Sequence, residues 1–243
     1  MSKNEKLFRR LFRTAEAAAN KGVVISVLSE LRATRSPMEF TSIYRAFRSS
    51  ALGTMHYLTV GPRSTSELVW ARAELTALPL NREFDWANSW LLPHVGRLNT
   101  FRRFANALQE QVIEGRLESA TSLLDEYIRL NGWSLWAVEL RAALLQMSQG
   151  TPAQREWLGQ LQSKTSNSIP GLLFEVFGDR NDETYSYDAI YGKCMHSFPR
   201  FESLAPWLVD YLKFRALGHI DNLEIALPRI LSRDITSSLL DYY

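Results

Sequence analysis

The stretch QVIEGRLESATSLLDEYIRLNG, residues 111–132, decides how the chain is interpreted, because it has a helical pattern on both sides of Gly115. Apolar residues recur there at three- and four-residue spacing, which places them on one face of a helix. They are Phe101, Phe104, Ala105, Leu108, Val112 and Ile113 before the glycine, and Leu117, Ala120, Leu123, Leu124, Tyr127, Ile128 and Leu130 after it. Glycine costs about 1 kcal/mol inside a helix but readily takes the positive φ that ends one. The pattern therefore predicts a turn at Gly115 between two amphipathic helices.

Comparable breaks recur along the whole chain, at intervals of roughly 30 to 38 residues, as expected of helical-repeat proteins. One set comprises Gly22, Gly53, Leu78–Asn81, Gly115, Gly150, Gly178–Asp182 and Gly218. A second set falls between them, at residues 35–37, 61–64, 95–99, 131–134, 166–171, 198–201 and 232–234. The two sets predict turns within helix pairs and between them. The expected fold is all-α: an α-solenoid of about seven antiparallel helix pairs in a right-handed superhelix.

The helices expected from this pattern span residues 3–20, 23–34, 37–49, 53–60, 65–78, 82–92, 99–114, 116–130, 134–149, 152–164, 170–177, 183–196, 201–217, 219–231 and 234–242. Several starts carry capping signals, such as Ser36 at an N-cap with Pro37 at the first helical position and Glu39 at the third. We expect one helical-repeat domain over residues 1–243, with a subdivision into a basic half, 1–98, and a second half, 99–243.

The segment from Phe104 to Leu130 resembles a tetratricopeptide-type helical hairpin. The residues at the positions where that repeat packs its helices are Phe104, Ala107, Leu108, Gly115, Leu117, Ala120, Leu124 and Leu130. A second copy follows, with Leu140, Ala143, Leu144, Met147, Gly150, Trp157 and Leu161. The resemblance is clearest over residues 101–164. It implies a scaffold for protein interactions and no particular partner.

Composition excludes several classes of protein. The chain has 243 residues, of which 46% are hydrophobic, and a net charge of +2. That is enough apolar material for a sizeable core, and too little charge to imply a polyanionic partner by itself. The single cysteine, Cys194, excludes an intrachain disulfide and a four-cysteine zinc site, and it favours a reducing compartment. Neither a secretory signal nor a membrane-spanning helix is expected, so we predict a soluble, cytoplasmic protein.

The charge is concentrated at the amino-terminal end. Residues 1–50 hold ten basic and four acidic side chains, a net charge of +6, so the remaining residues carry −4. The predicted partner-binding residues are Arg9, Arg10, Arg13, Arg45 and Arg48, together with Trp86 and Trp90, which share a helix face. A basic amphipathic helix at residues 3–20 is compatible with a solvated first solenoid helix, a nucleic-acid contact, a membrane-surface contact or a docking helix.

Motifs that carry chemistry are absent. The sequence has no phosphate loop, no dinucleotide-binding glycine motif, no HExxH and no GxSxG, so we predict no catalytic residue, cofactor or metal ligand. Cys194 and His196, with Tyr185, Tyr187 and Tyr191, are the candidates for an enzyme site. Residues two apart on a helix do not face each other, which favours a structural role for Cys194. The acidic run 179–188 lacks the glycine of a calcium loop and predicts a solvated turn that caps the next helix.

Three functions follow from these observations. The first is a non-catalytic scaffold or adaptor that binds a protein or peptide partner on a helical-repeat surface. The second is a regulator that contacts nucleic acid through its basic amino-terminal helices. The third is an enzyme with a site near Cys194 and His196. The apolar residues Leu239, Leu240, Tyr242 and Tyr243 also predict self-association through the carboxy-terminal helix.

Overall fold

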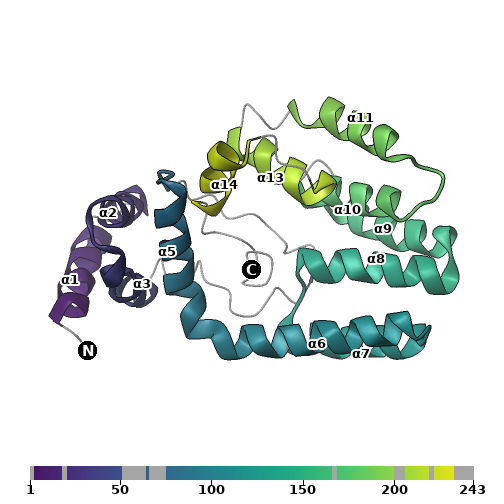
Figure 1. Cartoon of the computed structure of the whole chain (residues 1–243), viewed down its shortest axis with the longest axis horizontal. Coiled ribbons are helices and arrows are strands. Elements are labelled where there is room, and N and C mark those ends of the chain that lie inside the picture. Colours follow the sequence, from purple (N-terminus) through teal and green to yellow (C-terminus); the bar gives the residue numbers. More distant parts are fainter. Residues whose placement is uncertain are drawn as a thin grey trace. The chain divides into compact units, whose positions relative to one another are not determined.

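The computed structural model describes residues 3–17, 21–50, 64–65, 75–165, 169–199, 206–218 and 222–232. Every regular element within these ranges is a helix, and no strand occurs among them (Figure 1). The all-α prediction is therefore confirmed for the part of the chain that the structure describes. Contacts between the helices divide the chain into two compact units, which we describe one at a time.

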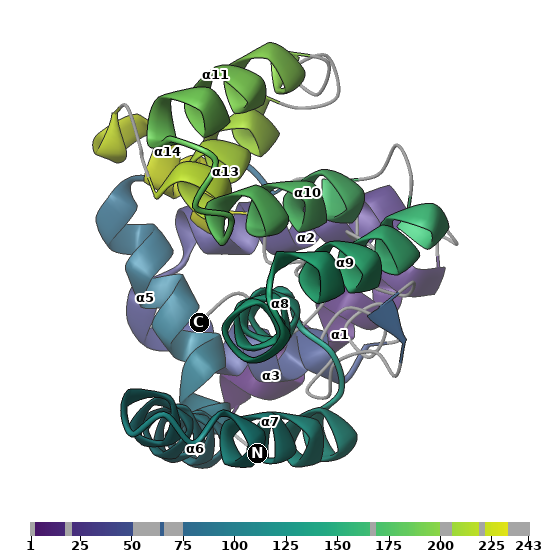
Figure 2. The ribbon, with the colours of Figure 1, turned by 90° about the vertical axis from the view of Figure 1, so that its right-hand side faces the viewer.

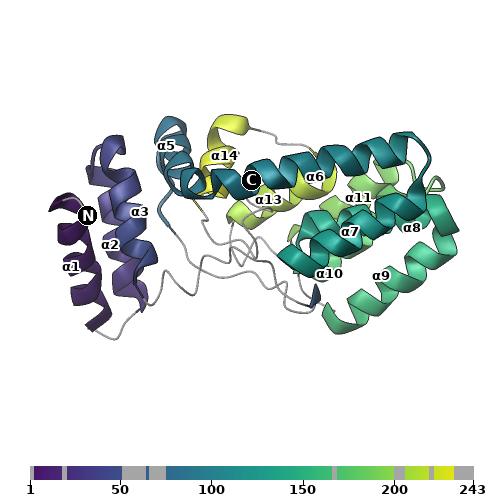
Figure 3. The same ribbon diagram turned by 90° about the horizontal axis from the view of Figure 1, so that it is seen from below.

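The first unit is built from five α-helices and two short 3-10 turns among the described residues. They are α1 (Lys3–Ala17), α2 (Lys21–Thr34), η1 (Pro37–Glu39), α3 (Phe40–Arg48), α5 (Leu80–Leu91), η3 (Leu92–His94) and α14 (Leu223–Leu231). Helix α1 packs on α2 and α3, and α3 packs in turn on α5, which also contacts α14. The side-by-side arrangement of α1, α2 and α3 is visible in Figure 3.

Local signals explain where these helices begin. The Ser36 hydroxyl accepts the Met38 N–H at 3.4 Å and Pro37 follows it, as the sequence predicts. The first turn is a 3-10 turn, and α3 starts only at Phe40. Helix α5 starts directly after Pro79, inside the break predicted at residues 78–81.

Aromatic rings make up much of the core of the first unit. Phe12 and Phe47 lie 5.5 Å apart between ring centroids, and Phe40 meets Trp86 edge to face at 5.6 Å. Phe8, Phe12, Phe40, Phe47 and Trp86 are all buried. Edge-to-face and tilted pairs of this kind add about 0.5–1.5 kcal/mol each beyond the burial of their area.

A charged pair lies inside this aromatic core. Arg32 of α2 and Glu83 of α5 form an ion pair in which both side chains are fully buried. The Arg32 guanidinium lies 5.2 Å from the centroid of Trp86, and Glu83 also accepts the backbone N–H of Leu78 at 2.7 Å. Burial raises the pKa of Glu83, although the Arg32 charge and the Leu78 N–H act against this shift. Arg82 donates to the carbonyl oxygen of Arg32, so α2 and α5 are joined by two adjacent side chains of α5.

The second unit is a series of helices joined by short turns. It contains α6 (Val95–Ile113) from Leu98 onward, then α7 (Leu117–Asn131), α8 (Leu135–Gln149), α9 (Thr151–Thr165), α10 (Ile169–Arg180), α11 (Tyr187–Ser197) and α13 (Pro206–Leu217). Helix α8 contacts α7 and α9, α9 contacts α10, and α10 contacts α11 and α13. Figure 2 shows α8 end-on, with α7 and α9 on either side of it.

The turn predicted at Gly115 is present. Helix α6 ends at Ile113 and α7 begins at Leu117, and Gly115 between them has φ = 74°. Gly132 and Gly150 end α7 and α8 with φ values of 79° and 84°. A side chain with a Cβ is strained in this left-handed region, which explains the glycine at each helix end.

The core of these hairpins contains residues that the resemblance singled out. A buried cluster is formed by Leu108, Ala120, Leu124, Ala137 and Leu144. Beside it, the rings of Phe104 and Tyr127 stack with centroids 4.4 Å apart. Ala120 is fully buried in this cluster.

Some predicted breaks are wrong. Helix α6 runs through residues 95–99, because Pro93 in η3 ends α5 just before it and Gly96 sits in the first turn of α6. Gly22 lies inside α2. The break predicted at Gly178–Asp182 is present only in its second part, because α10 continues to Arg180 and the turn follows it. Helix α11 starts four residues later than predicted, since residues 182–186 fold as a turn before its Ser186 cap.

Other expectations fall on residues outside the described ranges. These are the helices at 53–60 and 234–242, the break at Gly53, the apolar residues from Leu239 to Tyr243, and most of the helix at 65–78. The last four residues of that helix, 75–78, are described and are not helical. The single-domain organisation and its subdivision at residue 98 stay predictions.

Candidate partner-binding surface

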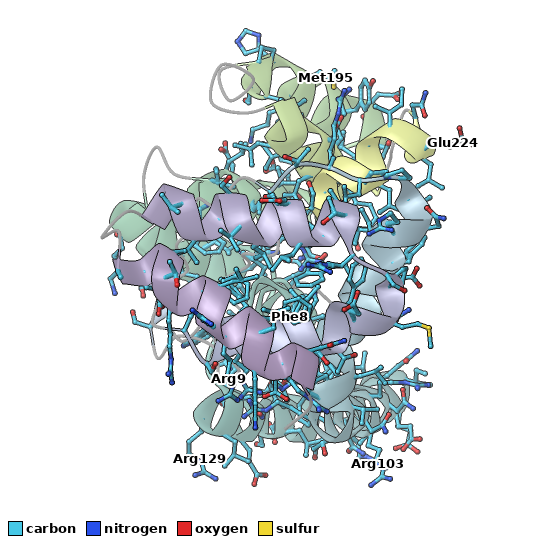
Figure 4. All side chains as sticks on the ribbon, turned by 90° about the vertical axis from the view of Figure 1, so that its left-hand side faces the viewer. Phe8, Arg9, Arg103, Arg129, Met195 and Glu224 are labelled. Atoms are coloured by element: carbon cyan, nitrogen blue, oxygen red, sulfur yellow. The ribbon has the colours of Figure 1, made fainter. Side chains whose placement is uncertain are left out.

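Helix α1 buries its aromatic side chains on one face and presents basic side chains on another. Phe8, Phe12 and Ala15 follow one another at four- and three-residue spacing, and all three are buried. Phe8 and the next residue, Arg9, project from opposite edges of the helix (Figure 4). The buried phenylalanines anchor α1 in the first unit and thereby fix the direction of its basic side chains.

Four basic side chains of α1 line one open hollow of about 620 Å³. We call Lys6, Arg9, Arg10 and Arg13 the α1 basic face. Thr14 and Ala17 complete the described part of the lining. Neighbouring members are three or four residues apart, so their side chains lie next to one another on the helix surface. The hollow therefore brings together three of the predicted binding residues.

The charges of the α1 basic face differ in availability. Arg9 is paired with Glu5 through Nη2 and Oε1 at 2.8 Å, and the Glu5 side chain is only 10% exposed. Lys6, Arg10 and Arg13 are exposed and form no ion pair with any residue that the structure describes. These three cations are thus available to an anion of a partner. At 0.1 M salt, exposed charges attract one another over a Debye length of about 10 Å.

Two leucines lie beside these cations. Leu7 is 48% exposed and Leu11 is 37% exposed, although both belong to a helix that buries its phenylalanines. Leu7 is three residues from Arg10 and therefore lies next to the basic face, and Leu11 continues from it four residues later. Neither leucine belongs to the described lining of the hollow. The surface combines cations with a small aliphatic strip.

The predicted arginines of α3 lie elsewhere in the first unit. Arg45 and Arg48 are exposed near the end of α3, and neither belongs to the described lining of the hollow. Burial and the charges of Arg48 and Arg97 lower the pKa of His94, which lies 3.3 Å from the Tyr44 hydroxyl. The charge of Arg48 therefore acts on His94, whose lowered pKa favours the neutral ring at pH 7.

The two tryptophans predicted as binding anchors are core residues. Trp86 and Trp90 are 0% and 2% exposed. Trp86 packs against Phe40 and the Arg32 guanidinium, and Trp90 lies 6.5 Å from Tyr44 between ring centroids. They share a helix face as expected, but that face points into the first unit and offers a partner no exposed ring.

The two main candidates for an enzyme site, Cys194 and His196, lie in different environments. Cys194 is buried, and burial raises the pKa of its thiol to about 11, so the thiolate is scarce at pH 7. His196 is exposed on the same helix. In the acidic run, Asp182 is buried and accepts two hydrogen bonds from Thr184, which lower its pKa, and it also pairs with Arg155. This run forms a tight turn in which Asp182 is not solvated.

Sequence reasoning missed one member of the α1 basic face and the two exposed leucines of the same helix. Lys6, Leu7 and Leu11 were not among the predicted binding residues, although Lys6 has the same three- and four-residue spacing to Arg9 and Arg10 that relates the arginines. No spacing in the sequence indicates that the two leucines are exposed, because a leucine at these positions usually joins the buried stripe.

Within the described residues, no group of three His, Cys, Asp or Glu side chains is placed to hold a metal ion. None of the helices in these ranges has the length and apolar character needed to cross a membrane. Comparisons with protein-family models, curated proteins and solved structures find no match to the chain.

Proposed function

We propose that this protein is a non-catalytic scaffold or adaptor that binds an acidic segment of a protein partner through the α1 basic face. The observation that carries the proposal is the gathering of Lys6, Arg9, Arg10 and Arg13 around one open hollow. Lys6, Arg10 and Arg13 have no ion-pair partner among the described residues, so their charge is available to carboxylates of a partner.

Repulsion between the like charges of α1 destabilises the helix, and this also supports a role in binding an anion. The α1 basic face contains four like-charge pairs at three- or four-residue spacing, and each destabilises a helix by about 0.2–0.5 kcal/mol. Lys6 adds to this cost, because a cation near a helix amino terminus opposes the macrodipole. A bound anion removes the repulsion. The phenylalanines on the buried face hold α1 in place without one.

The leucines favour a protein over a nucleic acid. Surfaces that bind single-stranded nucleic acid combine cations with aromatic side chains on which bases stack. The exposed apolar residues beside the α1 basic face are aliphatic, Leu7 and Leu11. An acidic segment that carries apolar residues matches both parts of this surface, since its carboxylates meet the cations and its apolar side chains meet the leucines.

We further propose that the hairpins of the second unit continue as an α-solenoid of antiparallel helix pairs with a right-handed superhelix. Two observations support this arrangement. The turns at Gly115 and Gly150 lie 35 residues apart and have similar φ values of 74° and 84°. The resemblance to tetratricopeptide hairpins covers the same segment, and stacked pairs of this kind serve as interaction surfaces.

A binding assay tests the proposed function. A short glutamate-rich peptide with leucine at every fourth position is labelled and titrated with the whole chain by fluorescence anisotropy. We expect binding that weakens as salt is added. The Arg10→Glu/Arg13→Glu variant should bind at least about tenfold more weakly, because two favourable charge contacts become repulsive.

The matched control changes the same charge elsewhere. Arg45→Glu/Arg48→Glu alters the net charge equally but leaves the described lining of the hollow intact, and it should change affinity by less than about threefold. Equal losses in both variants would assign binding to net charge alone. If a single-stranded DNA oligonucleotide bound more tightly than the peptide, the result would indicate a nucleic-acid partner and contradict the protein partner proposed here.

A further inference from the structure

The start of α11 and the turn before it, in the second unit, expose three aromatic side chains. Tyr185 is 39% exposed, Tyr187 is 57% exposed and Tyr191 is 37% exposed. The rings of Tyr187 and Tyr191 lie 6.2 Å apart between centroids, with an angle of 30° between their planes. We call Tyr185, Tyr187 and Tyr191 the α11 tyrosine patch. Grouped exposed aromatics of this kind mark surfaces that bind other molecules.

The local structure holds the patch in place. The Ser186 hydroxyl accepts the Ala189 N–H at 3.2 Å and caps α11. Ile190 and Cys194, four residues apart, are buried and fix the inner face of the helix. Tyr187 and Tyr191, also four residues apart, therefore lie on a fixed outer edge. Because the patch is already ordered, binding there costs little ordering entropy.

Two carboxylates near the patch in sequence have no ion-pair partner among the described residues. Asp188 lies in the first turn of α11, three residues before Tyr191, and is exposed. Glu183 is exposed in the preceding turn. Neither forms an ion pair with a residue that the structure describes. The helix macrodipole stabilises a carboxylate at the position of Asp188, so its charge is retained without a cationic partner.

One tyrosine of the patch already accepts a cation. The Lys193 ammonium lies 6.0 Å from the ring centroid of Tyr185 and is paired with Glu175 at 2.7 Å and Asp179 at 2.6 Å. Lys193 thus shows that a ring face and carboxylates together hold a cation in this part of the chain. Tyr187, Tyr191 and Asp188 offer the same combination outward.

Gly192 leaves the outer surface uncovered. It is exposed on α11, and a Cβ added there would meet no neighbouring atom within 4 Å. A helical side chain covers the surface over the preceding turn, which here holds Asp188. A long side chain at position 192 would therefore lie across the carboxylate and the adjacent Tyr191 ring. Alanine would suit the helix better than glycine by about 1 kcal/mol, so the open surface is not explained by helix stability.

We propose that the α11 tyrosine patch, with Asp188 and Glu183, binds a protein segment that carries arginine or lysine side chains. The guanidinium or ammonium group lies over the ring of Tyr187 or Tyr191 and meets the Asp188 carboxylate. The charge complementarity of the surface selects this occupant: its free charges are acidic and its rings have negative faces. This surface differs from the α1 basic face in its position and in the sign of its ligand, so the two proposals are independent.

The test uses the whole chain and a short labelled peptide of alternating arginine and glycine, with affinity measured by anisotropy and ring contacts by NMR. The wild type should bind, with shifts at the Tyr187 and Tyr191 rings. Tyr187→Phe/Tyr191→Phe keeps the ring faces and should bind within about twofold of the wild type. Tyr187→Leu/Tyr191→Leu keeps apolar bulk but removes the faces, and should bind about fivefold more weakly or worse.

Gly192→Gln separates binding from folding. Glutamine favours the helix over glycine, so the melting temperature should rise, while the long side chain covers the surface and weakens peptide binding. Unchanged affinity in this variant, or in the leucine variant, would overturn the proposal. Binding of the glutamate-rich peptide serves as the internal control, because it depends on α1 and should be the same in all three variants. The chain could also associate with itself at high concentration. If Arg10→Glu/Arg13→Glu abolished that association, the patch would bind the α1 basic face of a second copy, and the proposal of a separate partner would be overturned.

Discussion

The two units hold their helices together in different ways. In the first unit, buried contacts join residues that are about fifty positions apart, such as Arg32 with Glu83 and Tyr44 with His94. In the second unit, the buried cluster runs from Leu108 to Leu144, and its helices follow one another through short turns. The first unit has a charged pair at its centre, while the cluster of the second unit consists of apolar residues.

This difference separates two sources of stability. A buried ion pair recovers its large desolvation cost only when both partners are present and their hydrogen bonds are satisfied. The stability of an apolar cluster depends on shape and volume. The loss of unfolding free energy therefore increases with the number of atoms removed or added. Substitutions should therefore have all-or-none effects around Arg32 in the first unit, and graded effects around Ala120 in the second.

The largest effect is expected from Glu83→Ala. This change leaves the buried Arg32 charge and the Leu78 N–H without their acceptor, and it should lower the free energy of unfolding by about 3–5 kcal/mol. Urea denaturation measures the loss. Hydrogen exchange should locate it in α2 and α5, with α8 and α9 less affected.

A paired substitution sharpens this prediction. Arg32→Met/Glu83→Leu removes both charges and keeps apolar volume, so it should recover most of the lost stability. If the double variant is as unstable as Glu83→Ala, the loss comes from packing, and the contrast drawn between the two cores does not hold.

A smaller effect is expected from Ala120→Leu in the second unit. Ala120 is fully buried in the cluster with Leu108 and Leu124, so the added atoms should cost about 1–3 kcal/mol by overpacking. Ser122→Leu on the exposed face of the same helix is the control and should change stability by less than about 0.5 kcal/mol. Thermal unfolding followed by circular dichroism compares the two variants. Equal stability would mean that α7 is not closely packed at Ala120.

The turn glycines should show an effect of about 1–2 kcal/mol. At Gly115, with φ = 74°, a Cβ would meet no neighbour within 4 Å, so Gly115→Ala tests backbone strain alone and should be destabilising. Gly159→Ala, in the exposed middle of α9 and equally free of neighbours, should be stabilising by about 1 kcal/mol. Opposite signs in urea denaturation are the expected result, and a stabilising Gly115→Ala would contradict the turn.

The smallest effect concerns the pH dependence of the first unit. The pKa of His94 lies below its ordinary value of 6.5, because burial and the charges of Arg48 and Arg97 disfavour the protonated ring. The unfolded chain therefore binds the proton first, so the stability that His94 contributes is present above pH 6.5 and is lost as the pH falls through its folded pKa. The difference in unfolding free energy between the wild type and His94→Gln should narrow below pH 6.5. His196→Gln, at an exposed histidine, is the control, and a pH-independent difference for His94→Gln would rule out this linkage.

The sequence predicts the ends of individual helices better than the contacts between helices, for a physical reason. Helix ends at Gly115 and Gly150 are set by backbone preferences of the residues at the turn, which a sequence displays directly. The break predicted at residues 95–99 failed because a glycine in a first turn and a proline just before it produce the same local pattern as a turn. The pairing of Arg32 with Glu83 depends on where α2 and α5 pack, and no local pattern encodes a contact across fifty residues.

The same distinction applies to the candidate site. Arg9, Arg10 and Arg13 lie within five residues of one another, so helical spacing is sufficient to place them together. Trp86 and Trp90 also share a face, but spacing does not show whether that face is exposed, and tertiary packing turned it inward. The exposure of Leu7 and Leu11 depends on tertiary packing in the same way.

Cys194 gives the molecule a built-in chemical reporter. It is the only thiol in the chain, it is buried on the inner face of α11, and its raised pKa keeps it protonated at pH 7. A thiol reagent can therefore label the native chain only as fast as α11 opens and exposes the sulfur to solvent. The labelling rate of the unmodified protein thus measures the opening free energy of that helix, with no engineered cysteine and no competing site.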